Sequence, residues 1–300
     1  MAERGDLAVV VVTYNALPYI EQCLHSVSGW ETVVVDHGSK DGTVGLVEER
    51  FHDVRLVRQD NPGLAAGWNR GIRETSSPYV LILNADAWAV GDGVRRLLAF
   101  ADSEPRAAVV GPKLLNTDGS LQRSVRGFPT LWRLATEYFF LRKLAPHTQA
   151  MNSFYAGGFD HDHVTEAEFV MGSVMLVRRA AIDDVGLLDE GFFLFSEETD
   201  WCYRFHEAGW QVLFYPDAEF VHVGGASHGG RMYTENLRGH LRFMAKHHGP
   251  VEAERARRLL LAALRLRGVL FRGERGRMYR DAAGWLASGS AQSLLSAPRA

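Results

Sequence analysis

Three apolar runs in the first half of the chain end close to residues that could hold a ligand. Residues 79–83 form one such run, and Asp86 comes just past its end. Two earlier runs end beside Asn15 and Asp36. Ligands bind at the carboxyl ends of strands in an open parallel sheet, where a carboxylate can hold a divalent cation against a phosphate. The pattern predicts a nucleotide-dependent enzyme, although an aspartate after a strand also suits an ordinary polar turn.

The segment 36–43, which reads Asp-His-Gly-Ser-Lys-Asp-Gly-Thr, has two interpretations. The carboxylate of Asp36 could accept the imide N–H of uracil or thymine. Glycine, serine and aspartate are also common in turns, and Asp41 could cap a helix that follows. Both interpretations stay open on this segment alone.

A glycine series follows the third predicted strand, with Gly63, Gly67 and Gly71 at four-residue spacing and Asn69 among them. Glycine lets the backbone approach a ligand closely, and a helix N-terminus with free N–H groups suits a diphosphate. The series is therefore a candidate diphosphate contact. Close packing of a helix explains the same spacing equally well.

Acidic residues follow an aromatic stretch at 192–201. Phenylalanines lead directly into Glu197, Glu198 and Asp200. Acids in the first turn of a helix are favoured by the helix dipole, which accounts for them without a function. A carboxylate beside apolar surface also has its pKa raised toward neutrality, as a general base requires.

A histidine ends a later strand. His222 closes the run 218–221, and it could join Asp86 on one metal ion if the fold brings the two together. The chain has twelve histidines, so a chance position competes with this interpretation.

These residues depend on elements that alternate along the chain. Strands are predicted at 7–13, 32–35, 54–58, 79–83 and 107–110, with helices between them, which indicates βαβ units and a mainly parallel sheet. Later elements are predicted as a helix within 131–144, a strand at 168–178, a helix at 196–209, and strands at 211–215 and 218–222. Helices follow at 234–247, 251–267 and 276–287. We expect one α/β domain over residues 1–230 and a helical region over 231–300.

The composition excludes several classes of protein. A hydrophobic content of 46% and a formal net charge of −3 suit a globular protein and give no reason to expect nucleic-acid binding. Two cysteines far apart favour a reduced, cytoplasmic setting. The first residues lack the apolar stretch of a signal peptide, and no apolar run approaches the ~20 residues that span a membrane.

The C-terminal region is basic. Residues 251–280 hold nine arginines against three glutamates, which suits an anionic partner surface. On a helix, Arg258, Arg265 and Arg272 fall on one side, and an apolar set covers much of the other: Leu259, Leu260, Leu264, Leu270 and Phe271. The helix either lies on an anionic bilayer or packs on the rest of the protein.

Taken together and in order, these segments resemble the family-2 glycosyltransferases, which have the GT-A fold. The resemblance covers roughly residues 7–248 and, within the family, is nearest to bacterial rhamnosyltransferases of cell-envelope polysaccharide assembly. The matching segments are 12–15, 36–43, 61–71, 84–86, 111–114, 118–122, 171–173, 186–190, 192–204 and 216–222. The resemblance implies a Rossmann-type, mixed but mainly parallel sheet flanked by helices, followed by a C-terminal helical appendage.

The resemblance also implies an inverting transfer from a nucleotide-diphosphate sugar. Asp36 would read the pyrimidine, and Asp86 would bind Mg²⁺ or Mn²⁺ on the diphosphate with His222 completing the metal shell. The matched motifs give a nucleotide-sugar-binding set: Thr13, Asn15, Asp36, Gly63, Gly67, Asn69, Asn84, Asp86 and Lys113. Asn84 takes the first position of the family's DxD-like motif.

The general base maps to Glu198 in this resemblance. The family usually has aspartate there, so the side chain is one methylene longer, and Glu197 or Asp200 could substitute. The predicted donor is dTDP-rhamnose, with another dTDP- or UDP-sugar next. The predicted acceptor is a growing glycan or a sugar on a polyprenyl diphosphate, reached from the cytoplasmic face of the cell membrane by a peripheral enzyme.

Two other classes of protein compete with this interpretation. A nucleotidyltransferase would need a Gly-rich loop with Lys or Arg directly after the first strand, and residues 14–18 do not supply one. A degenerate carbohydrate-binding protein would not need to retain Asp36, Asp86, Glu198 and His222 together.

Overall fold

The structure, a computed structural model, describes residues 5–224 and 230–293. The chain divides into two compact units, each described here by itself. Within the described residues, the sheet unit comprises 5–125, 160–193 and 197–224, and the helical unit comprises 126–159, 194–196 and 230–293. The sequence did not indicate that the segment 126–159 would join the C-terminal helices.

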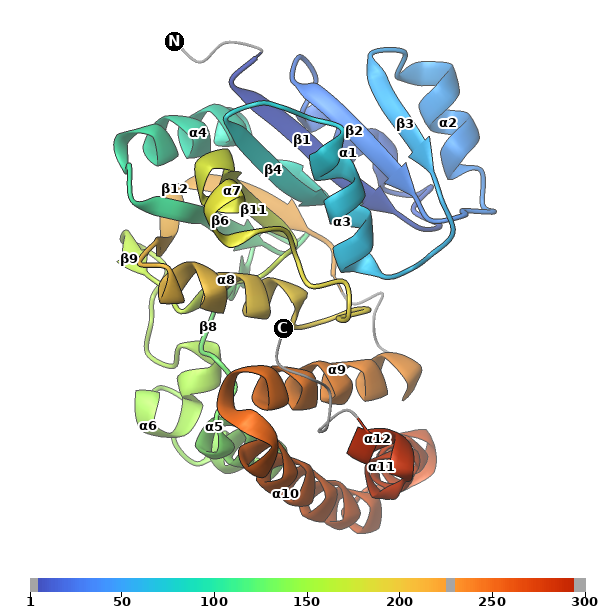
Figure 1. Cartoon of the computed structure of the whole chain (residues 1–300), viewed down its shortest axis with the longest axis vertical. Coiled ribbons are helices and arrows are strands. Elements are labelled where there is room, and N and C mark those ends of the chain that lie inside the picture. Colours follow the sequence, from blue (N-terminus) through green and yellow to red (C-terminus); the bar gives the residue numbers. More distant parts are fainter. Residues whose placement is uncertain (1–4, 225–229, 294–300) are drawn as a thin grey trace. The chain divides into compact units, whose positions relative to one another are not determined.

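The first half of the sheet unit is a parallel array (Figure 1). Its strands are β1 (Leu7–Thr13), β2 (Glu31–Asp36), β3 (Val54–Arg58) and β4 (Tyr79–Asn84), in the order β3-β2-β1-β4. Thr13 is in register with Asp36, and Val12 is in register with Asn84. The parallel register therefore brings the polar ends of three strands to one edge of the sheet, as the sequence predicts.

The second half of the sheet also contains strands of opposite direction. β11 (Val174–Arg178) lies antiparallel between β4 and β6 (Ala107–Leu115), and β12 (Gln211–His222) runs parallel to β6. The three-residue strand β5 (Ala87–Ala89) adds to the far edge of β12. The sheet is thus mixed but mainly parallel, which confirms the predicted fold class.

Two predicted strand patterns differ in detail. The predicted strands 211–215 and 218–222 form the single strand β12, whose register shifts between Tyr215 and Glu219. The predicted strand 168–178 is divided into β10 (Phe169–Val170) and β11, because residues 171–173 leave the sheet in a turn. The short strands β7 (Leu121–Gln122), β8 (Val125–Arg126) and β9 (Thr165–Glu166) were not predicted.

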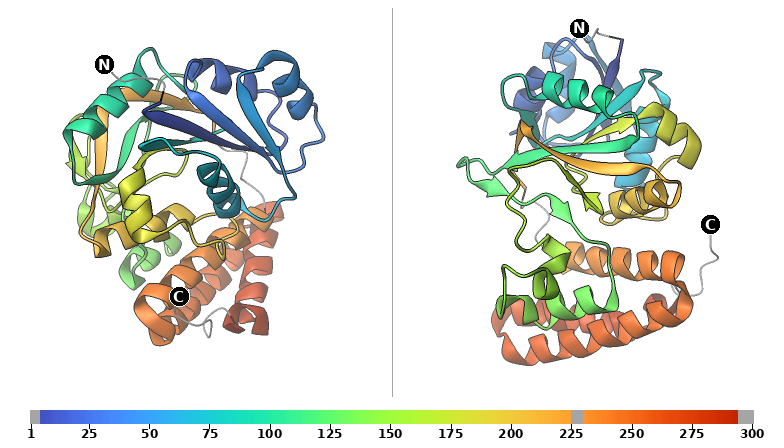
Figure 2. Two further views of the ribbon diagram at one scale, coloured as in Figure 1. Left: turned by 45° about the horizontal axis from the view of Figure 1, so that its top comes forward. Right: turned by 90° about the vertical axis from the view of Figure 1, so that its left-hand side faces the viewer.

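Helices cover both faces of the sheet (Figures 1 and 2). They are α1 (Ile20–Ser26), α2 (Thr43–Arg50), α3 (Leu64–Arg73), α4 (Gly93–Ser103), α7 (Arg179–Val185) and α8 (Glu197–Glu207). Residues of α1, α2 and α4 share one core with Val9 and Val11. Val10, which points to the other face, lies against α3. Burial on both faces explains why β1 is an unbroken apolar run.

The helical unit has its own core. Its elements are α5 (Leu131–Tyr138), η1 (Leu141–Lys143), α6 (Gln149–Asn152), η2 (Ser153–Tyr155), α9 (Gly230–Phe243), the π-helical turn η3 (Met244–His248), α10 (Gly249–Leu270), α11 (Gly273–Ala287) and α12 (Gly289–Ser293). Leu134 of α5, Leu237 of α9, Leu260 of α10 and Leu286 of α11 are fully buried together. The helix predicted within 131–144 ends at Tyr138.

The apolar side predicted for the basic helix is largely a packing face. Leu260 and Leu264 of α10 are fully buried in the core of the helical unit. Arg267 is buried there too: its guanidinium donates to the carbonyls of Glu137 and Tyr138 at the end of α5. A helix's last carbonyls lack partners within the helix, so Arg267 ties α10 to α5. This part of the amphipathic pattern is therefore explained without a membrane.

We predict that His240 makes the helical unit sensitive to acid. This α9 residue is buried edge-on to the rings of Tyr138 and Phe154, and burial lowers its pKa from 6.5 to about 4. Below pH 6.5 the unfolded chain therefore takes up the proton before the folded chain does. Full protonation should cost about 3 kcal/mol of unfolding free energy.

Urea denaturation between pH 7 and pH 4 measures this effect. His240→Phe should reduce the loss of unfolding free energy over that range, whereas replacing the exposed His52 with glutamine serves as the control. Parallel curves for wild type and His240→Phe would contradict the assignment.

Candidate active site

Asp86 and His222 meet at the edge of the sheet unit. β5 pairs with the end of β12 so that His222 stands opposite Ala87, one residue past Asp86. The Val223 N–H donates to the Asp86 carbonyl, and the Gly224 N–H donates to Asp86 Oδ2 at 3.2 Å. As a result, His222 Nε2 lies 3.5 Å from Asp86 Oδ1. Strand pairing thus joins a carboxylate and an imidazole that lie far apart in the sequence.

The lowered pKa of Asp86 favours the ionised carboxylate, which is the form that binds a cation. Burial alone would raise the pKa of the Asp86 carboxyl, but its interaction with His222 and the Gly224 N–H outweigh burial and lower that pKa. The described residues contain no cluster of three or more His, Cys, Asp or Glu side chains that could hold a metal. A divalent cation here would need further oxygen ligands, and Mg²⁺ in nucleotide sites takes them from phosphates and water. A site with only Asp86 and His222 as protein ligands would leave the other coordination positions to phosphate and water oxygens.

Asp36 presents one free oxygen at the adjoining strand end. Its side chain is buried, and Oδ2 accepts the N–H groups of Gly38 and Ser39 at 2.9 and 3.0 Å. Asp36 Oδ1 is also buried and has no partner in the described part of the chain; the same holds for Oγ1 of Thr13, its register neighbour. Buried polar atoms are nearly always paired, so both atoms point to a ligand.

Asn15 shapes the loop around Asp36. It has a left-handed φ of 52°, its N–H donates to Ser39 Oγ, and its Oδ1 accepts the Lys40 N–H at 2.8 Å. Asn15 therefore ties the turn after β1 to the turn after β2. This gives Asn15 a loop-holding role beside the unpartnered atoms of Thr13 and Asp36.

The glycine series is explained by helix packing. A Cβ on Gly71 would lie 2.2 Å from Val10 Cγ1, and one on Gly67 would lie 2.6 Å from His37 Nε2. Gly63, with a φ of +110°, lies under the Phe193 backbone, where a Cβ would be 2.7 Å from the carbonyl oxygen. The four-residue spacing lets α3 approach β1. Of the two interpretations left open, packing accounts for Gly67 and Gly71.

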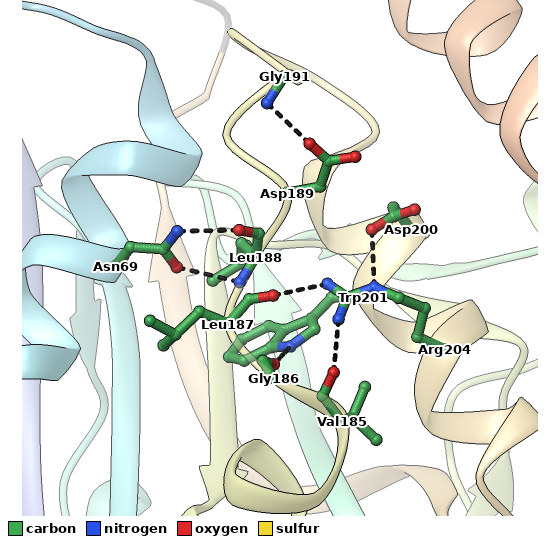
Figure 3. A network of polar contacts seen from close by, with 10 residues as sticks. All are labelled: Asn69, Val185, Gly186, Leu187, Leu188, Asp189, Gly191, Asp200, Trp201 and Arg204. Carbon is green, nitrogen blue, oxygen red and sulfur yellow. Dashed lines mark hydrogen bonds and ion pairs between the residues drawn. The ribbon is translucent and has the colours of Figure 1, made fainter. Parts of the chain in front are cut away.

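Asn69 holds a loop, which differs from its predicted position on a ligand (Figure 3). It is buried on α3, where its Oδ1 accepts the Leu188 N–H and its Nδ2 donates to the Leu188 carbonyl and to Glu190 Oε1. These bonds occupy the amide on both sides. Asn69 was named as a ligand contact from the matched 61–71 segment, whereas in the structure its amide bonds to the 186–191 loop.

The same loop is fastened to α8 (Figure 3). Arg204 donates to the carbonyls of Val185 and Leu187, and Trp201 Nε1 donates to the Gly186 carbonyl. Asp200 is fully buried and pairs with Arg204 at 2.9 Å. Asp200 therefore holds the arginine that anchors the loop, and its carboxylate is occupied.

The other two acids of α8 have unlike surroundings. Glu197 is buried, and burial followed by the nearby Glu198 raises its pKa well above the ordinary value. Glu198 is half-buried as a residue, although its Oε2 is buried. Its Cβ lies 3.3 Å from where a Cβ on Gly172 would stand, and the Trp68 ring is beside the same spot. The three acids thus have different surroundings: Glu197 is buried, Glu198 is half-buried as a residue, and Asp200 is buried and ion-paired.

Sequence reasoning missed the surroundings of Glu198. Phe192, the first of the phenylalanines that lead into the acids, is a core residue, and the aromatic ring beside Gly172 is Trp68. Ser173, the next residue, accepts the Asn84 N–H through its carbonyl at 2.9 Å. The turn 171–173 thus lies between Asn84 and Glu198, and its Met-Gly-Ser motif was the signal available in the sequence.

Lys113 lies among a different group of residues. Its Nζ is 3.2 Å from Asp162 Oδ1, and it lines a polar pocket of about 320 Å³ with Arg96, Asp162, Pro216, Asp217 and Glu219. None of the other predicted site residues lines this pocket. The position of Lys113 gives no support to the predicted nucleotide contact.

The fold and this site place the chain in a known family of enzymes. Residues 8–184 match the family described as glycosyl transferase family 2, and the chain belongs to that family. It is therefore a glycosyltransferase, as the sequence analysis predicted. Among the described residues, every helix is too short or too polar to cross a bilayer.

Two curated relatives act with rhamnose. The chain is 30% identical over 238 residues to the N-acetylglucosaminyl-diphospho-decaprenol L-rhamnosyltransferase of Mycobacterium tuberculosis, which covers 72% of this chain and 75% of that protein. It is 24% identical over 238 residues to the dTDP-rhamnosyl transferase RfbF of Shigella flexneri, covering 74% and 70%.

Solved structures share the fold at lower identity. GalNAc-T7 with UDP, GalNAc and Mn²⁺ matches with a TM-score of 0.61 and 17% identity over 97% of this chain, which spans 57% of that structure's length. The mannosyltransferase PcManGT of Pyrobaculum calidifontis, with GDP-Man and Mn²⁺, matches with a TM-score of 0.56 and 17% identity, covering 99% of this chain and 83% of the other. Both confirm a GT-A-like fold.

We predict that Gly71→Ala destabilises the protein, because its Cβ would overlap Val10. Overpacking of this kind costs about 1–3 kcal/mol of unfolding free energy. Gly45→Ala is the matched control: Gly45 also lies inside a helix but has open space around it, so alanine should stabilise by roughly 0.5–1 kcal/mol. Chemical denaturation measures both values. Equal effects of the two substitutions would show that α3 does not need its glycine for packing.

Proposed function

We propose that this glycosyltransferase moves L-rhamnose from dTDP-rhamnose to a hydroxyl group of a glycan or of a sugar carried on a polyprenyl diphosphate. The observation that carries transfer from a nucleotide-sugar is the 3.5 Å approach of His222 to Asp86, together with the unpartnered oxygen of Asp36 at another strand end. A transferase that uses another dTDP- or UDP-sugar is the alternative. A nucleotidyltransferase and a carbohydrate-binding protein are disfavoured by membership of the family.

Asp36 and Thr13 suit a pyrimidine base. The imide of thymine or uracil presents one N–H donor with a carbonyl acceptor on each side. Asp36 offers one free acceptor, and the hydroxyl of Thr13 beside it can donate. Guanine would present two adjacent donors and favour a carboxylate with both oxygens free, yet Asp36 Oδ2 is already occupied by two N–H groups.

Asp86 and His222 would hold Mg²⁺ or Mn²⁺ together with the diphosphate of the donor. When bound, the cation neutralises charge that develops on the departing nucleotide diphosphate. Asn84 in the first position of the motif leaves a single protein carboxylate at this site. Support for a divalent cation comes from the two Mn²⁺-containing structures that share the fold.

Glu198 is the proposed general base. The acceptor oxygen forms its bond to the anomeric carbon on the side opposite the diphosphate, whose bond to that carbon breaks, while Glu198 takes the hydroxyl proton. Of the three acids predicted for this role, Glu197 is buried and Asp200 is fully buried and paired with Arg204, so Glu198, which is half-buried as a residue, is the least buried of the three. The Trp68 ring beside it supplies apolar surface.

The sugar and the acceptor are proposed from the two rhamnosyltransferase relatives. One relative's name states a rhamnose transfer to N-acetylglucosaminyl-diphospho-decaprenol, and the other's name states dTDP-rhamnose chemistry. A lipid-linked acceptor would favour a peripheral enzyme on the cytoplasmic face of the membrane.

The end of α10 offers a surface for such a membrane. Leu266, Val269 and Leu270 are exposed, Val269 by 82%, and the exposed side chains of Arg265 and Arg272 flank them. Apolar side chains at the headgroup boundary with arginines around them suit an anionic bilayer. Each arginine near such a surface contributes about 1 kcal/mol, screened by salt.

We predict that Asp86→Ala abolishes transfer and removes the effect of Mn²⁺ on donor binding. Calorimetric titration of dTDP-rhamnose with and without Mn²⁺ measures the second effect. Asp162→Ala, which removes an exposed carboxylate from the Lys113 pocket, is the control and should keep the Mn²⁺ effect. Near-normal transfer by folded Asp86→Ala would remove the metal role from Asp86.

We predict that Glu198→Gln binds the donor normally but turns over about 10²–10⁴-fold more slowly, because only proton acceptance is lost. Glu197→Gln should retain far more activity, since it replaces a buried acid whose raised pKa favours the protonated form. Transfer kinetics at saturating donor measure both. Normal turnover by Glu198→Gln with a dead Glu197→Gln or Asp200→Asn would identify a different base.

We predict that the protein sediments with anionic but not zwitterionic liposomes at low salt. Replacing both Val269 and Leu270 with serine should reduce the bound fraction strongly. Val251→Ser, at an exposed valine near the start of the same helix, is the matched control. Unchanged binding by the double variant, or equal binding to both lipids, would mean that the end of α10 is not the membrane surface.

A further inference from the structure

The motif Asp118-Gly119-Ser120-Leu121-Gln122 has no role in the function proposed above, yet its last residue contacts His222. Gln122, on β7, places its Oε1 2.7 Å from His222 Nδ1. The Nε2 of the same amide lies 3.1 Å from the backbone carbonyl oxygen of His222 and 2.9 Å from Asn116 Oδ1. One glutamine therefore touches the histidine both at its ring and at its backbone.

The backbone carbonyl fixes which way this amide faces. A carbonyl oxygen only accepts hydrogen bonds, so the group of Gln122 that faces it must be the NH₂. Turning the amide over would place two acceptors 3.1 Å apart and leave both without a donor. Gln122 Oε1 must then face His222 Nδ1. An amide oxygen accepts, so Nδ1 carries a proton.

A series of hydrogen bonds that begins at Asp118 gives the same orientation for the Gln122 amide. Asp118, an acceptor when ionised, accepts a hydrogen bond from the Ser120 hydroxyl at 2.6 Å. Ser120 Oγ in turn accepts from Asn116 Nδ2 at 2.9 Å. The remaining side of the Asn116 amide is its oxygen, which accepts from Gln122 Nε2. Every hydrogen bond in this series is donated in the same direction, from the buried ring of His222 toward the exposed carboxylate of Asp118.

We propose that Gln122 is a positioning residue that keeps the proton of neutral His222 on Nδ1, so that Nε2 is the nitrogen left to bind a divalent cation together with Asp86. A metal ligand needs an unprotonated ring nitrogen, and a hydrogen bond at the other nitrogen fixes which one that is. The role toward the cation rests on the proposed function. The tautomer itself does not.

The competing arrangement is unfavourable in this geometry. A proton on Nε2 could reach Asp86 Oδ1 only across 3.5 Å, whereas Nδ1 lies 2.7 Å from Gln122. The Nε2–H tautomer would also leave a bare Nδ1 facing the amide oxygen. If Gln122 is removed, Nδ1 loses its acceptor, and the carboxylate of Asp86 becomes the better partner for the proton.

Long-range ¹H–¹⁵N NMR of the histidine rings tests the tautomer in the metal-free protein at pH 8, above the usual histidine range. The signals of His222 are assigned by their loss in His222→Gln. Wild type should show a protonated Nδ1 and an unprotonated Nε2. Gln122→Met should move the proton toward Nε2, while Gln122→Glu, which keeps an acceptor beside Nδ1, should restore the wild-type pattern. Gln211→Met, on β12 but bonded to Glu166, controls for the substitution itself.

Titration of Mn²⁺ into the protein with dTDP, followed by electron paramagnetic resonance, tests the consequence. Gln122→Met should bind Mn²⁺ about 10–100-fold more weakly, the usual effect of losing a group that orients a ligand, and Gln122→Glu should recover most of that loss. Wild-type affinity in Gln122→Met would overturn the role toward the cation.

The two measurements separate this inference from the proposed function. A protonated Nε2 in wild type, or a tautomer unchanged in Gln122→Met, overturns the inference whatever the enzyme transfers. If wild type binds no Mn²⁺ with dTDP, the proposed metal site fails, and the NMR comparison still decides whether Gln122 fixes the ring.

Discussion

The pairing of β5 with the end of β12 is the constraint on which the candidate site depends. It brings Asp86, one residue before β5, to His222, the last residue of β12, and it aligns the Gly224 N–H with the Asp86 carboxylate. The backbone hydrogen bonds of this short ladder, and not the side chains, fix the separation of the two potential ligands. Any ligand that joins Asp86 and His222 therefore meets a preformed pair and needs little rearrangement.

The other parts of the site are held in place by residues that take no part in the proposed reaction. Glycines let α3 lie close against β1, which places Asn69 where it can clamp Leu188. Asp200 and Arg204 secure the same loop from α8, the helix that carries Glu198. Glu198 therefore lies on a helix that is bonded to this loop, and the loop is bonded in turn to α3. Fixed positioning of this kind keeps a general base within hydrogen-bonding distance of its substrate.

Much of the fold could be predicted because buried parallel strands leave a strong pattern. The apolar runs that became β1, β2 and β4 placed Asp36 and Asp86 at strand ends without any structure. The rest depends on contacts that leave no local pattern. β5 has only three residues, Asn69 bonds to a loop more than a hundred residues away, and Gln122 meets His222 across a hundred positions. The amphipathic pattern of α10 was visible, but Leu260 and Leu264 pack in the core of the helical unit, and such a pattern does not say what covers it.

The central claim is that Asp86 and His222 hold a divalent cation on the diphosphate of a pyrimidine nucleotide read by Asp36. Anomalous diffraction from crystals grown with Mn²⁺ and dTDP tests it most directly. The account predicts one manganese peak bonded to Asp86 and His222 Nε2, with diphosphate oxygens completing the shell and the thymine imide on Asp36 Oδ1. Manganese bound elsewhere, for example in the Lys113 pocket, or a thymine away from Asp36, would contradict it.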